Sequence, residues 1–381
     1  MMINKKNLTA IKRHHKIKGK IEIKLKDNLD SEEKLSIYYT PGVGAVSQYI
    51  FENPKDSDNY LWTNNNLAVI SDGSAVLGLG DIGPKAALAV MEGKSMIFKQ
   101  FANIDAVPIV IDVHKPKEII DTIKAISPSF GAINLEDIKA PECFEVEEAL
   151  KKDLNIPVMH DDQHGTAVVC LAGLINATKL ANKDLNSCKI VIVGAGAAGS
   201  AIARLINKYR KGAEIIILDS KGIISKNRKD LDKYKIQLLK ISNPKNVDGD
   251  LSKALKNCDI FIGVSKPGIL NKQKIKLMNK KPIVFAMANP VPEIYPDEAK
   301  KAGVFIIATG RSDFPNQINN ALAFPGIFRG ALDNKVNKIT DEHKIKAAET
   351  IANLVKKPTP KKIVPDIFNK NLVKSISKII S

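Results

Sequence analysis

Two pairs of adjacent acidic residues, Glu136-Asp137 and Asp161-Asp162, are the first groups in the sequence that could do chemistry together. Each pair follows a short apolar run typical of a β-strand, and the carboxyl ends of parallel strands meet at one edge of an α/β sheet. Four carboxylates at one point repel each other unless a cation holds them, which favours a divalent metal site. The alternative is a helix N-cap with solvated acids, because Asp is a favoured capping residue. The acidic residues alone leave both interpretations open.

A glycine-rich turn is the second candidate site. It follows an apolar strand predicted over residues 189–193, opens a helix over residues 198–209, and precedes a strand that ends at Asp219. The turn consists of Gly194, Ala195, Gly196, Ala197, Ala198 and Gly199. Glycines at this spacing let a pyrophosphate approach the backbone, and the acid binds a ribose, so we predict a nicotinamide-dinucleotide site. Residues 78–83 match the same pattern after only a short apolar run, and we interpret them as a close backbone turn.

Predicted strands alternate with helices along the chain, which indicates an α/β fold. The strands are expected over residues 67–70, 107–113, 132–135, 157–159, 189–193, 214–218, 259–264, 282–287 and 304–308. A helix is expected from Pro84, because proline suits the first helical position. We predict an N-terminal α/β substrate and metal domain over residues 1–163. A Rossmann-type dinucleotide-binding domain with C-terminal helices is predicted over residues 164–381.

The remaining segments have weaker patterns. Residues 21–26 alternate apolar side chains with charged ones and predict an edge strand or an arm. Residues 38–44 present two phenols in a loop rather than a helix, because Pro and Gly are adjacent there. The Lys-rich span 221–256 is expected to form surface helices, and residues 341–381 a helical pair broken by Pro358 and Pro360.

The composition excludes several classes of protein. The net charge is +17, but only six of the 58 basic residues are Arg and the Lys residues are scattered, so we expect no nucleic-acid partner. No apolar run approaches the ~18 residues of a membrane span, and the basic N-terminus has no apolar core of a signal peptide. Four scattered cysteines favour a reducing cytoplasm.

The sequence resembles the malic enzymes in their short bacterial form, from about Tyr38 to Leu332. The motifs that carry the resemblance are Tyr39 to Gly42, Asp72-Gly73 with Leu77 to Asp81, Glu92 to Lys94, Asn134 to Asp137, Asp161 to Thr166, Gly194 to Gly199, and Asn319-Asn320 with Phe324 to Gly326. The resemblance implies oxidative decarboxylation of malate to pyruvate and CO2, with NAD or NADP as cofactor and Mg²⁺ or Mn²⁺ bound. A malolactic-type enzyme or an oxaloacetate decarboxylase on the same scaffold is the alternative. We also expect a homodimer or a higher homo-oligomer.

The same resemblance assigns roles to individual residues. It implies Glu136, Asp137 and Asp162 as metal ligands, Asp161 beside the metal, Lys94 as general base, Tyr39 as general acid, Asn289 and Asn319 on the cofactor, and Lys94, Asn289 and Asn320 on the substrate. Oxygen-only ligands suit hard Mg²⁺ or Mn²⁺. Lys94 must be neutral to act as a base, so we expect burial and a neighbouring cation to lower its pKa below about 10.4. A solvated Lys94, and Tyr38 in place of Tyr39, are the competing interpretations.

Three points stay open in the sequence. The large eukaryotic members carry an Arg where this chain has Ala75, so the residue that anchors the substrate carboxylate is not identified. Asp219 favours NAD through the ribose hydroxyl, whereas Ser220 and Lys221 could receive the 2′-phosphate of NADP. Some bacterial members have a phosphotransacetylase-like tail, and because this sequence stops at Ser381 we expect no regulation through one.

Overall fold

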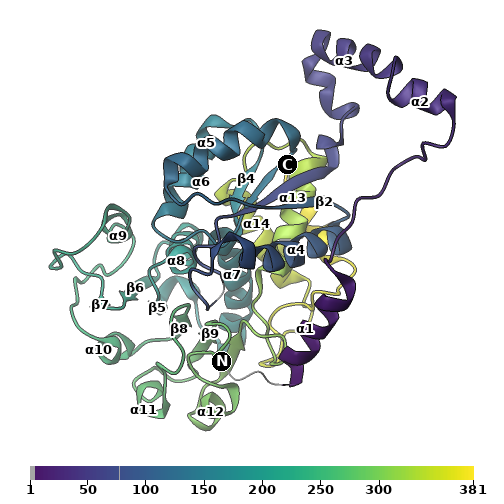
Figure 1. The fold of residues 1–381 in the computed structure, drawn as a ribbon. Coiled ribbons are helices and arrows are strands. Elements are labelled where there is room, and N and C mark those ends of the chain that lie inside the picture. Colours follow the sequence, from purple (N-terminus) through teal and green to yellow (C-terminus); the bar gives the residue numbers. More distant parts are fainter. Residues whose placement is uncertain (1–4, 77) are drawn as a thin grey trace.

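Two mainly parallel sheets organise the computed structural model, which describes residues 5–76 and 78–381 (Figure 1). The first sheet has the order β2-β1-β3-β4. Its strands are β1 (Asn66–Ser71), β2 (Asp105–Val110), β3 (Ile133–Leu135) and β4 (Val158–His160). All pair in parallel, with Ile70 opposite Leu135 and Leu135 opposite His160. The residues that follow β3 and β4 therefore leave the same edge of the sheet from neighbouring strands.

Side chains along β1 point alternately to the two faces of the sheet, and each face is covered by different helices. Leu67 and Val69 share one core with α4, whereas Ala68 and Ile70 share another with α5 and α6. These helices are α4 (Gly83–Ala102), α5 (Pro116–Ile126) and α6 (Glu142–Asp153). Pro84 lies in the first turn of α4, as expected, and the helix ends at Asn103 in the left-handed conformation.

The second sheet has the order β10-β9-β8-β5-β6-β7 and is parallel except for the antiparallel pair β6–β7. Its strands are β5 (Lys189–Val193), β6 (Glu214–Asp219), β7 (Gly222–Ile223), β8 (Ile260–Gly263), β9 (Ile283–Ala286) and β10 (Ile306–Thr309). The predicted strands and the Rossmann-type architecture are confirmed. The accompanying helices are α7 (Asp161–Ala181), α8 (Ala197–Tyr209), α9 (Lys233–Leu238), α10 (Leu251–Leu255), α11 (Lys272–Ile275) and α12 (Pro296–Lys301). In the span 221–256, short α9 and α10 alternate with β7 and loops, so the prediction of surface helices is only partly right.

C-terminal helices join the two sheets. They are α13 (Phe324–Asp333), α14 (Asp341–Asn353) and α15 (Leu372–Ser377), and the predicted prolines lie between the last two. Phe98 of α4 packs against Phe324 and Phe328 of α13, with ring centroids 4.7 and 5.5 Å apart. One apolar core thus runs from α4 through α13 to the second sheet. The domain boundary predicted at residue 163 stays a prediction.

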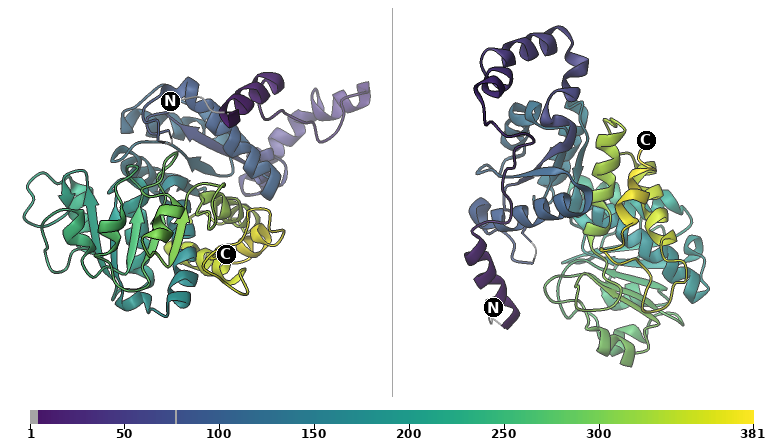
Figure 2. Two further views of the ribbon diagram at one scale, coloured as in Figure 1. Left: turned by 90° about the horizontal axis from the view of Figure 1, so that it is seen from below. Right: turned by 90° about the vertical axis from the view of Figure 1, so that its right-hand side faces the viewer.

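The N-terminal segment contains α1 (Lys5–Ile17), α2 (Glu32–Tyr38) and α3 (Gly42–Glu52). Figures 1 and 2 show α2 and α3 projecting away from both sheets. Two expectations need correction here. Residues 38–44 are not all loop, because α2 ends at Tyr38 and α3 begins at Gly42. Residues 21–26 form no helix and, among the described residues, pair with no strand, so the predicted edge strand is not found.

The glycine motif at residues 78–83 is a backbone turn, as interpreted from its context. Gly80 and Gly83 have φ values of 79° and 74°, which favour glycine. A Cβ at Gly78 would lie 2.2 Å from the carbonyl oxygen of Asn289, so this turn packs closely on the loop after β9. Leu77 of the same motif lies outside the described residues. Among those described, no helix has the length and apolar character to cross a membrane.

Candidate active site

Three carboxylates meet where the first sheet ends. Oxygen atoms of Glu136, Asp137 and Asp162 lie within 4.8 Å of one another. Glu136 and Asp137 directly follow β3, whereas Asp162 lies in the first turn of α7, directly after β4. The backbone N–H of Asp137 donates to Asp162 Oδ2 at 2.8 Å, which fixes the two loops relative to each other. The neighbouring strands therefore bring together the residues that the sequence pattern indicated.

Glu136 and Asp137 are the most deeply buried of the three carboxylates, and each is 4% exposed. Its Oε2 accepts from Asn134 Nδ2 at 3.0 Å, and its backbone N–H donates to Ile70 in β1. Burial and the nearby charge of Asp162 raise the pKa of Glu136 well above its ordinary range. The fold thus holds an accumulation of negative charge that a cation would relieve.

Lys94, on α4, contacts this group of carboxylates. Its Nζ lies 2.6 Å from Asp161 Oδ2 and 2.7 Å from Glu136 Oε1, and 4.3 Å from the Phe324 ring centroid. The side chain is 7% exposed, so the interpretation as a solvated lysine is wrong. The expected lowering of its pKa is also not found. Burial does lower the pKa of Lys94, but the charges of Asp161 and Glu136 outweigh burial and raise it.

Asp161 is fully buried at the first residue of α7. Its Oδ2 accepts from Lys94, and Gly165 leaves the space for its other oxygen, since a Cβ there would lie 1.8 Å from Asp161 Oδ1. Burial raises the pKa of Asp161, and the charge of Lys94 opposes that shift. The Asp161–Lys94 pair therefore has both a proton donor and a proton acceptor away from bulk water.

Of the two histidines that flank the acids, His164 makes a structural contact, whereas both ring nitrogens of the fully buried His160 lack a hydrogen-bond partner among the described residues. His164 Nε2 lies 2.9 Å from Glu147 Oε2, and burial lowers the pKa of His164 to about 3, so the ring is neutral. Glu147 Oε1 also accepts from the backbone N–H of His160 and pairs with Lys151 at 2.7 Å. The sequence pattern did not identify Glu147, which anchors β4 and α7 from inside α6.

The asparagines predicted to bind ligands occupy three different settings. Asn289 is exposed in the loop after β9, where its carbonyl oxygen meets the turn at Gly78. The side-chain oxygen of Asn319 accepts from Ala321 N at 2.9 Å, so this residue caps the following 3₁₀ turn. Asn320 lies beside Gly165 at the start of α7, close to Asp161. Of the three, Asn320 is the one that the structure brings next to the acidic cluster.

Glu293 is a further residue that the sequence pattern missed. It is fully buried and accepts from Ser265 N and Ala288 N, at 3.2 and 3.0 Å. A Cβ at Gly263 would lie 2.3 Å from its carboxyl group, so the end of β8 must be glycine. Glu293 therefore ties the loops after β8 and β9, where Asn289 lies. Its only sequence signal is its position after the Asn-Pro turn.

The glycine-rich turn after β5 has one open position. Gly194 has a φ of 120° and packs on Val264, and a Cβ at Gly199 would lie 1.7 Å from the Gly194 oxygen. A Cβ at Gly196 would meet nothing within 4 Å, so the backbone there faces free space at the start of α8. A cavity of about 870 Å³ lies over this turn and extends to Asp219 and Ser265. Space beside a helix N-terminus suits a pyrophosphate.

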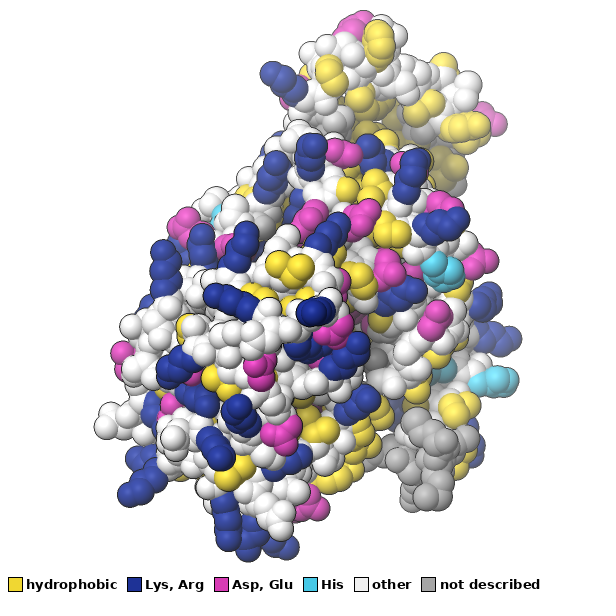
Figure 3. Space-filling view, turned by 90° about the vertical axis from the view of Figure 1, so that its left-hand side faces the viewer, with side chains coloured by type: hydrophobic (Ala, Val, Ile, Leu, Met, Phe, Trp, Pro, Cys, Tyr) yellow, Lys and Arg dark blue, Asp and Glu magenta, His cyan; other side chains and the backbone are white. Residues whose placement is uncertain are grey.

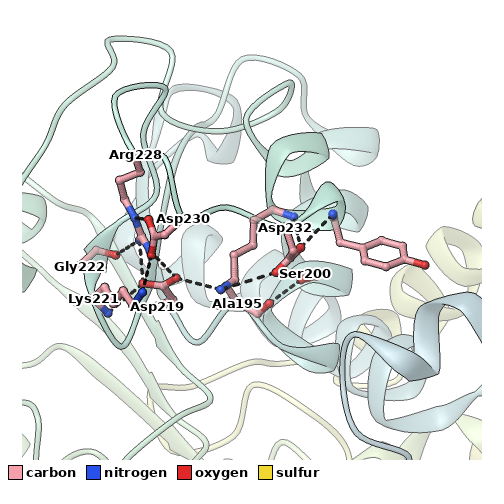
Figure 4. A network of polar contacts seen from close by, with 10 residues as sticks. Ala195, Ser200, Asp219, Lys221, Gly222, Arg228, Asp230 and Asp232 are labelled. Atoms are coloured by element: carbon pink, nitrogen blue, oxygen red, sulfur yellow. Dashed lines mark hydrogen bonds and ion pairs between the residues drawn. The ribbon is translucent and has the colours of Figure 1, made fainter. Parts of the chain in front are cut away.

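Asp219, predicted to bind the ribose, is held in an ionic network at the edge of this cavity (Figure 4). Its oxygens accept from Arg228 at 2.7 and 3.0 Å and from Lys221 N at 2.9 Å, and Lys235 lies 3.1 Å away. Burial raises the pKa of Asp219, but the hydrogen bonds from Arg228, Lys221 and Lys235 together outweigh burial and lower the pKa below its ordinary value. Lys221 Nζ pairs with Asp230 instead. The sequence pattern did not identify Arg228.

Tyr39 is the predicted site residue that the fold places elsewhere. It directly follows α2 on the projecting arm and is 66% exposed, whereas Lys94 is buried between the sheets. Figure 1 shows α2 well away from α4 and α7. Tyr38 donates to Asp27 Oδ2 at 2.8 Å and is therefore also committed within the arm. Neither phenol completes the site of its own chain.

Comparison with known proteins identifies the family. The N-terminal domain of malic enzymes matches residues 18–151, and the NAD-binding domain of malic enzymes matches residues 163–381. The chain belongs to the malic enzyme family. A bifunctional malic/malolactic enzyme of Bacillus subtilis (strain 168) is 47% identical over 371 residues, which are 96% of this chain and 90% of that protein.

Other malic enzymes agree in sequence and structure. An NAD-dependent malic enzyme of Geobacillus stearothermophilus is 49% identical over 96% of this chain and 76% of its own length. The crystal structure of an NAD-dependent malic enzyme from Thermotoga maritima superposes with a TM-score of 0.94 at 46% identity, over 97% of this chain and 98% of that one. This chain is accordingly an oxidoreductase of the NAD(P)-dependent malic enzyme type, as its motifs implied.

Proposed function

We propose that this malic enzyme oxidises and decarboxylates malate at the acidic cluster, with Lys94 as general base and Glu136, Asp137 and Asp162 as ligands of a divalent cation. The observation that carries the proposal is the meeting of a buried lysine with a carboxylate triad at the end of the first sheet. The glycine-rich turn begins α8, which packs against α7, and is the proposed dinucleotide site.

The donor set fits a hard cation. All three groups are carboxylates, the ligands that Mg²⁺ and Mn²⁺ prefer. Burial and the charge of Asp162 raise the pKa of Glu136 although Lys94 lowers it, and a bound cation would favour the ionised carboxylate. A bound divalent cation would supply Lewis acidity at the C2 oxygen of the substrate, where negative charge develops as CO2 is lost.

Lys94 serves the first proton transfer. It must be neutral to take the proton of the C2 hydroxyl, and Asp161 Oδ2, 2.6 Å from Nζ, is the group placed to hold the proton that Lys94 gives up. The charges that raise its pKa, from Asp161 and Glu136, are the same ones that a cation would offset. Phe324 covers the other side of the ammonium group and excludes water.

The oxidation step can be tested with keto-acid reduction. Lys94→Ala should lose both malate oxidation and the reduction of a 2-keto acid, by about 10²–10⁴-fold each. Tyr39, as the acid that protonates C3, should affect mainly the step after decarboxylation, so Tyr39→Phe should still reduce oxaloacetate. Equal losses of keto-acid reduction in the two variants would contradict this division of roles.

We propose NAD as the preferred cofactor. Asp219 is ionised and lies at the cavity edge, where it can accept from ribose hydroxyls. A 2′-phosphate would meet this carboxylate, and Arg228 is already bound to it by two hydrogen bonds. Relatives include both an NAD-dependent and an NADP-dependent malic enzyme, so the choice depends on these local contacts.

The decisive assay follows nicotinamide absorbance with malate and Mn²⁺, with NAD and NADP in parallel, and measures pyruvate and lactate. Pyruvate formed together with reduced cofactor supports the proposal. Lactate without net reduction would instead indicate a malolactic enzyme, a second candidate because a bifunctional malic/malolactic enzyme is among the relatives. No turnover of malate with either cofactor would refute both.

We also propose that the enzyme works in the cytoplasm. All four cysteines are free and buried, and burial raises the pKa of the Cys170 thiol. Unpaired thiols suit a reducing compartment. Fractionation of the source cells, followed by the malate assay on each fraction, tests this location.

A further inference from the structure

Glu147 is a buried charged residue that lies outside the acidic cluster. Figure 3 shows Lys and Arg side chains spread over one face of the protein, which is where charged groups ordinarily lie. Glu147, on α6, is instead 5% exposed. Burying an ion pair adds little stability compared with apolar side chains of similar volume, so the burial of Glu147 needs another explanation.

The contacts of Glu147 bracket the two acids at the start of α7. Its Oε1 accepts from the backbone N–H of His160, the last residue of β4, at 2.9 Å. Its Oε2 lies 2.9 Å from Nε2 of His164, in the first turn of α7. Asp161 and Asp162 lie between these two residues in the chain. One carboxylate therefore holds the backbone just before the acids and a side chain just after them.

The start of α7 depends on this contact because it lacks the usual local support. A helix is commonly fixed at its first residues by an N-cap side chain such as Ser, Thr, Asp or Asn. Here His160 occupies the N-cap position, and in the part of the chain that the structure describes its side chain makes no capping hydrogen bond. Glu147 supplies the missing anchor from α6, and Gln163 Nε2 adds a contact to its Oε2 at 3.4 Å.

Glu147 also connects the two loops that carry the proposed metal ligands. Helix α6 follows the loop of Glu136 and Asp137, whereas α7 begins at Asp161 and contains Asp162 in its first turn. The hydrogen bond from Asp137 N to Asp162 Oδ2 joins the two loops at the cluster itself. Glu147 joins the two helices that follow these loops. The two links together fix the position of Asp162 relative to the other two carboxylates.

Lysines on two helices balance the charge of Glu147. Lys151 Nζ lies 2.7 Å from its Oε1, one turn further along α6. Burial and the charge of Lys151 lower the pKa of Lys344, on α14, and the charge of Glu147 opposes that shift. The carboxylate thus lies where α6, α7 and α14 meet, with positive charge close to it.

We infer that Glu147 is a positioning residue of the metal site, which places Asp162 for a shared cation by holding the start of α7 against α6. Glu147 acts through the backbone of His160 and the ring of His164, and is not itself a ligand. This inference rests on the proposed role of Glu136, Asp137 and Asp162 as metal ligands.

Calorimetric titration of the purified enzyme with Mn²⁺ tests the inference. Glu147→Ala removes both contacts and should weaken Mn²⁺ binding by about 10–100-fold. The Mn²⁺ concentration for half-maximal malate turnover should rise by the same factor. Glu147→Gln should recover most of the lost affinity, because its amide oxygen can accept from His160 N and its amide nitrogen can donate to the neutral ring of His164.

Leu150→Ala is the matched control for a loss of stability. Leu150 is fully buried on the same helix, so its truncation should lower the free energy of unfolding by about 2–5 kcal/mol. Because the contacts of Glu147 stay in place, this variant should keep the Mn²⁺ affinity of the wild type. Glu148→Ala, exposed at the next position, should match the wild type in both measurements.

Three results would overturn the inference. They are wild-type Mn²⁺ affinity in Glu147→Ala, an equal loss of affinity in Leu150→Ala, and an equal loss in Glu147→Gln. His164→Ala removes one of the two contacts from the side of α7 and provides the measurement if Glu147→Ala does not fold. It should weaken Mn²⁺ binding about 10-fold, and unchanged affinity there would also count against the inference. A wild-type enzyme that binds no Mn²⁺ would instead refute the proposed metal site.

Discussion

Replacing Glu136 by Gln should separate the stability of the metal-free protein from its affinity for metal. Glu136 lies 2.7 Å from Lys94 and within 4.8 Å of two other carboxylate ligands. At an effective dielectric constant near 20, the attraction is worth about 6 kcal/mol and the two repulsions together at least about 7 kcal/mol. The repulsions therefore at least offset the attraction, and a neutral Gln removes the cost of burying a charge. We therefore expect the metal-free variant to unfold at a free energy equal to, or about 1 kcal/mol above, that of the wild type.

With Mn²⁺ bound, the wild type should be more stable than Glu136→Gln, the reverse of the order expected without metal. Loss of groups that only orient metal ligands costs 10–100-fold in affinity, so loss of a ligand should weaken Mn²⁺ binding by at least about 100-fold. At a Mn²⁺ concentration 100 times the wild-type dissociation constant, the wild type gains about 2.7 kcal/mol and Glu136→Gln only about 0.4 kcal/mol.

Urea unfolding in chelator and in Mn²⁺, with Mn²⁺ affinity from calorimetry, measures both effects. Asp121→Asn removes one exposed negative charge from α5, which pairs with Lys117, and serves as the matched control. The control should behave like the wild type in both conditions. Unchanged Mn²⁺ affinity in Glu136→Gln, or a metal-free variant several kcal/mol less stable, would refute the reasoning.

Three further outcomes follow from the dinucleotide domain. Gly196→Val should fold normally, because a Cβ there meets nothing within 4 Å, but it should raise the dinucleotide dissociation constant sharply. Gly199→Ala should instead lower the melting temperature. A calorimetric scan measures the melting temperatures, and a fluorescence titration measures the dissociation constants. Asp219→Ser should lower kcat/KM with NAD and narrow the preference over NADP about 10-fold or more, read from paired kinetics; an unchanged ratio would reject the proposed role. Burial raises the pKa of Asp259, but its partners, Lys183 among them, outweigh burial and hold the pKa below its ordinary value. The ionised Asp259 therefore stabilises the fold above about pH 4, and this stabilisation is lost as the pH falls through the pKa of the folded state. The free energies of unfolding of wild type and Asp259→Asn, measured by urea titration, should therefore differ by about 1–3 kcal/mol at pH 7 and converge in acid.

The order of strands and the glycine turn could be predicted because their signals are local. A parallel strand covered on both faces is a short apolar run, and the turn at Gly194 needs a φ of 120° that few other residues adopt. The structure of residues 21–26 could not be predicted in this way, because their alternating pattern is that of a strand but they pair with no strand among the described residues. Their apolar side chains are exposed in the single chain, so pattern alone could not place them.

The sequence by itself determined which residue types end the strands, and so the chemistry of the acidic cluster. Residues that follow adjacent parallel strands, such as Asp137 and Asp162, meet at one edge by the geometry of the sheet. Only the tertiary structure decided which basic side chains pair with these carboxylates and with Asp219. Lys94 reaches Asp161, 67 residues away, because α4 docks across the sheet, and Arg228 reaches Asp219 from a loop without a pattern. Tyr39 shows the same limit most clearly, because its motif lies in the chain but the fold places it exposed on the projecting arm, away from Lys94.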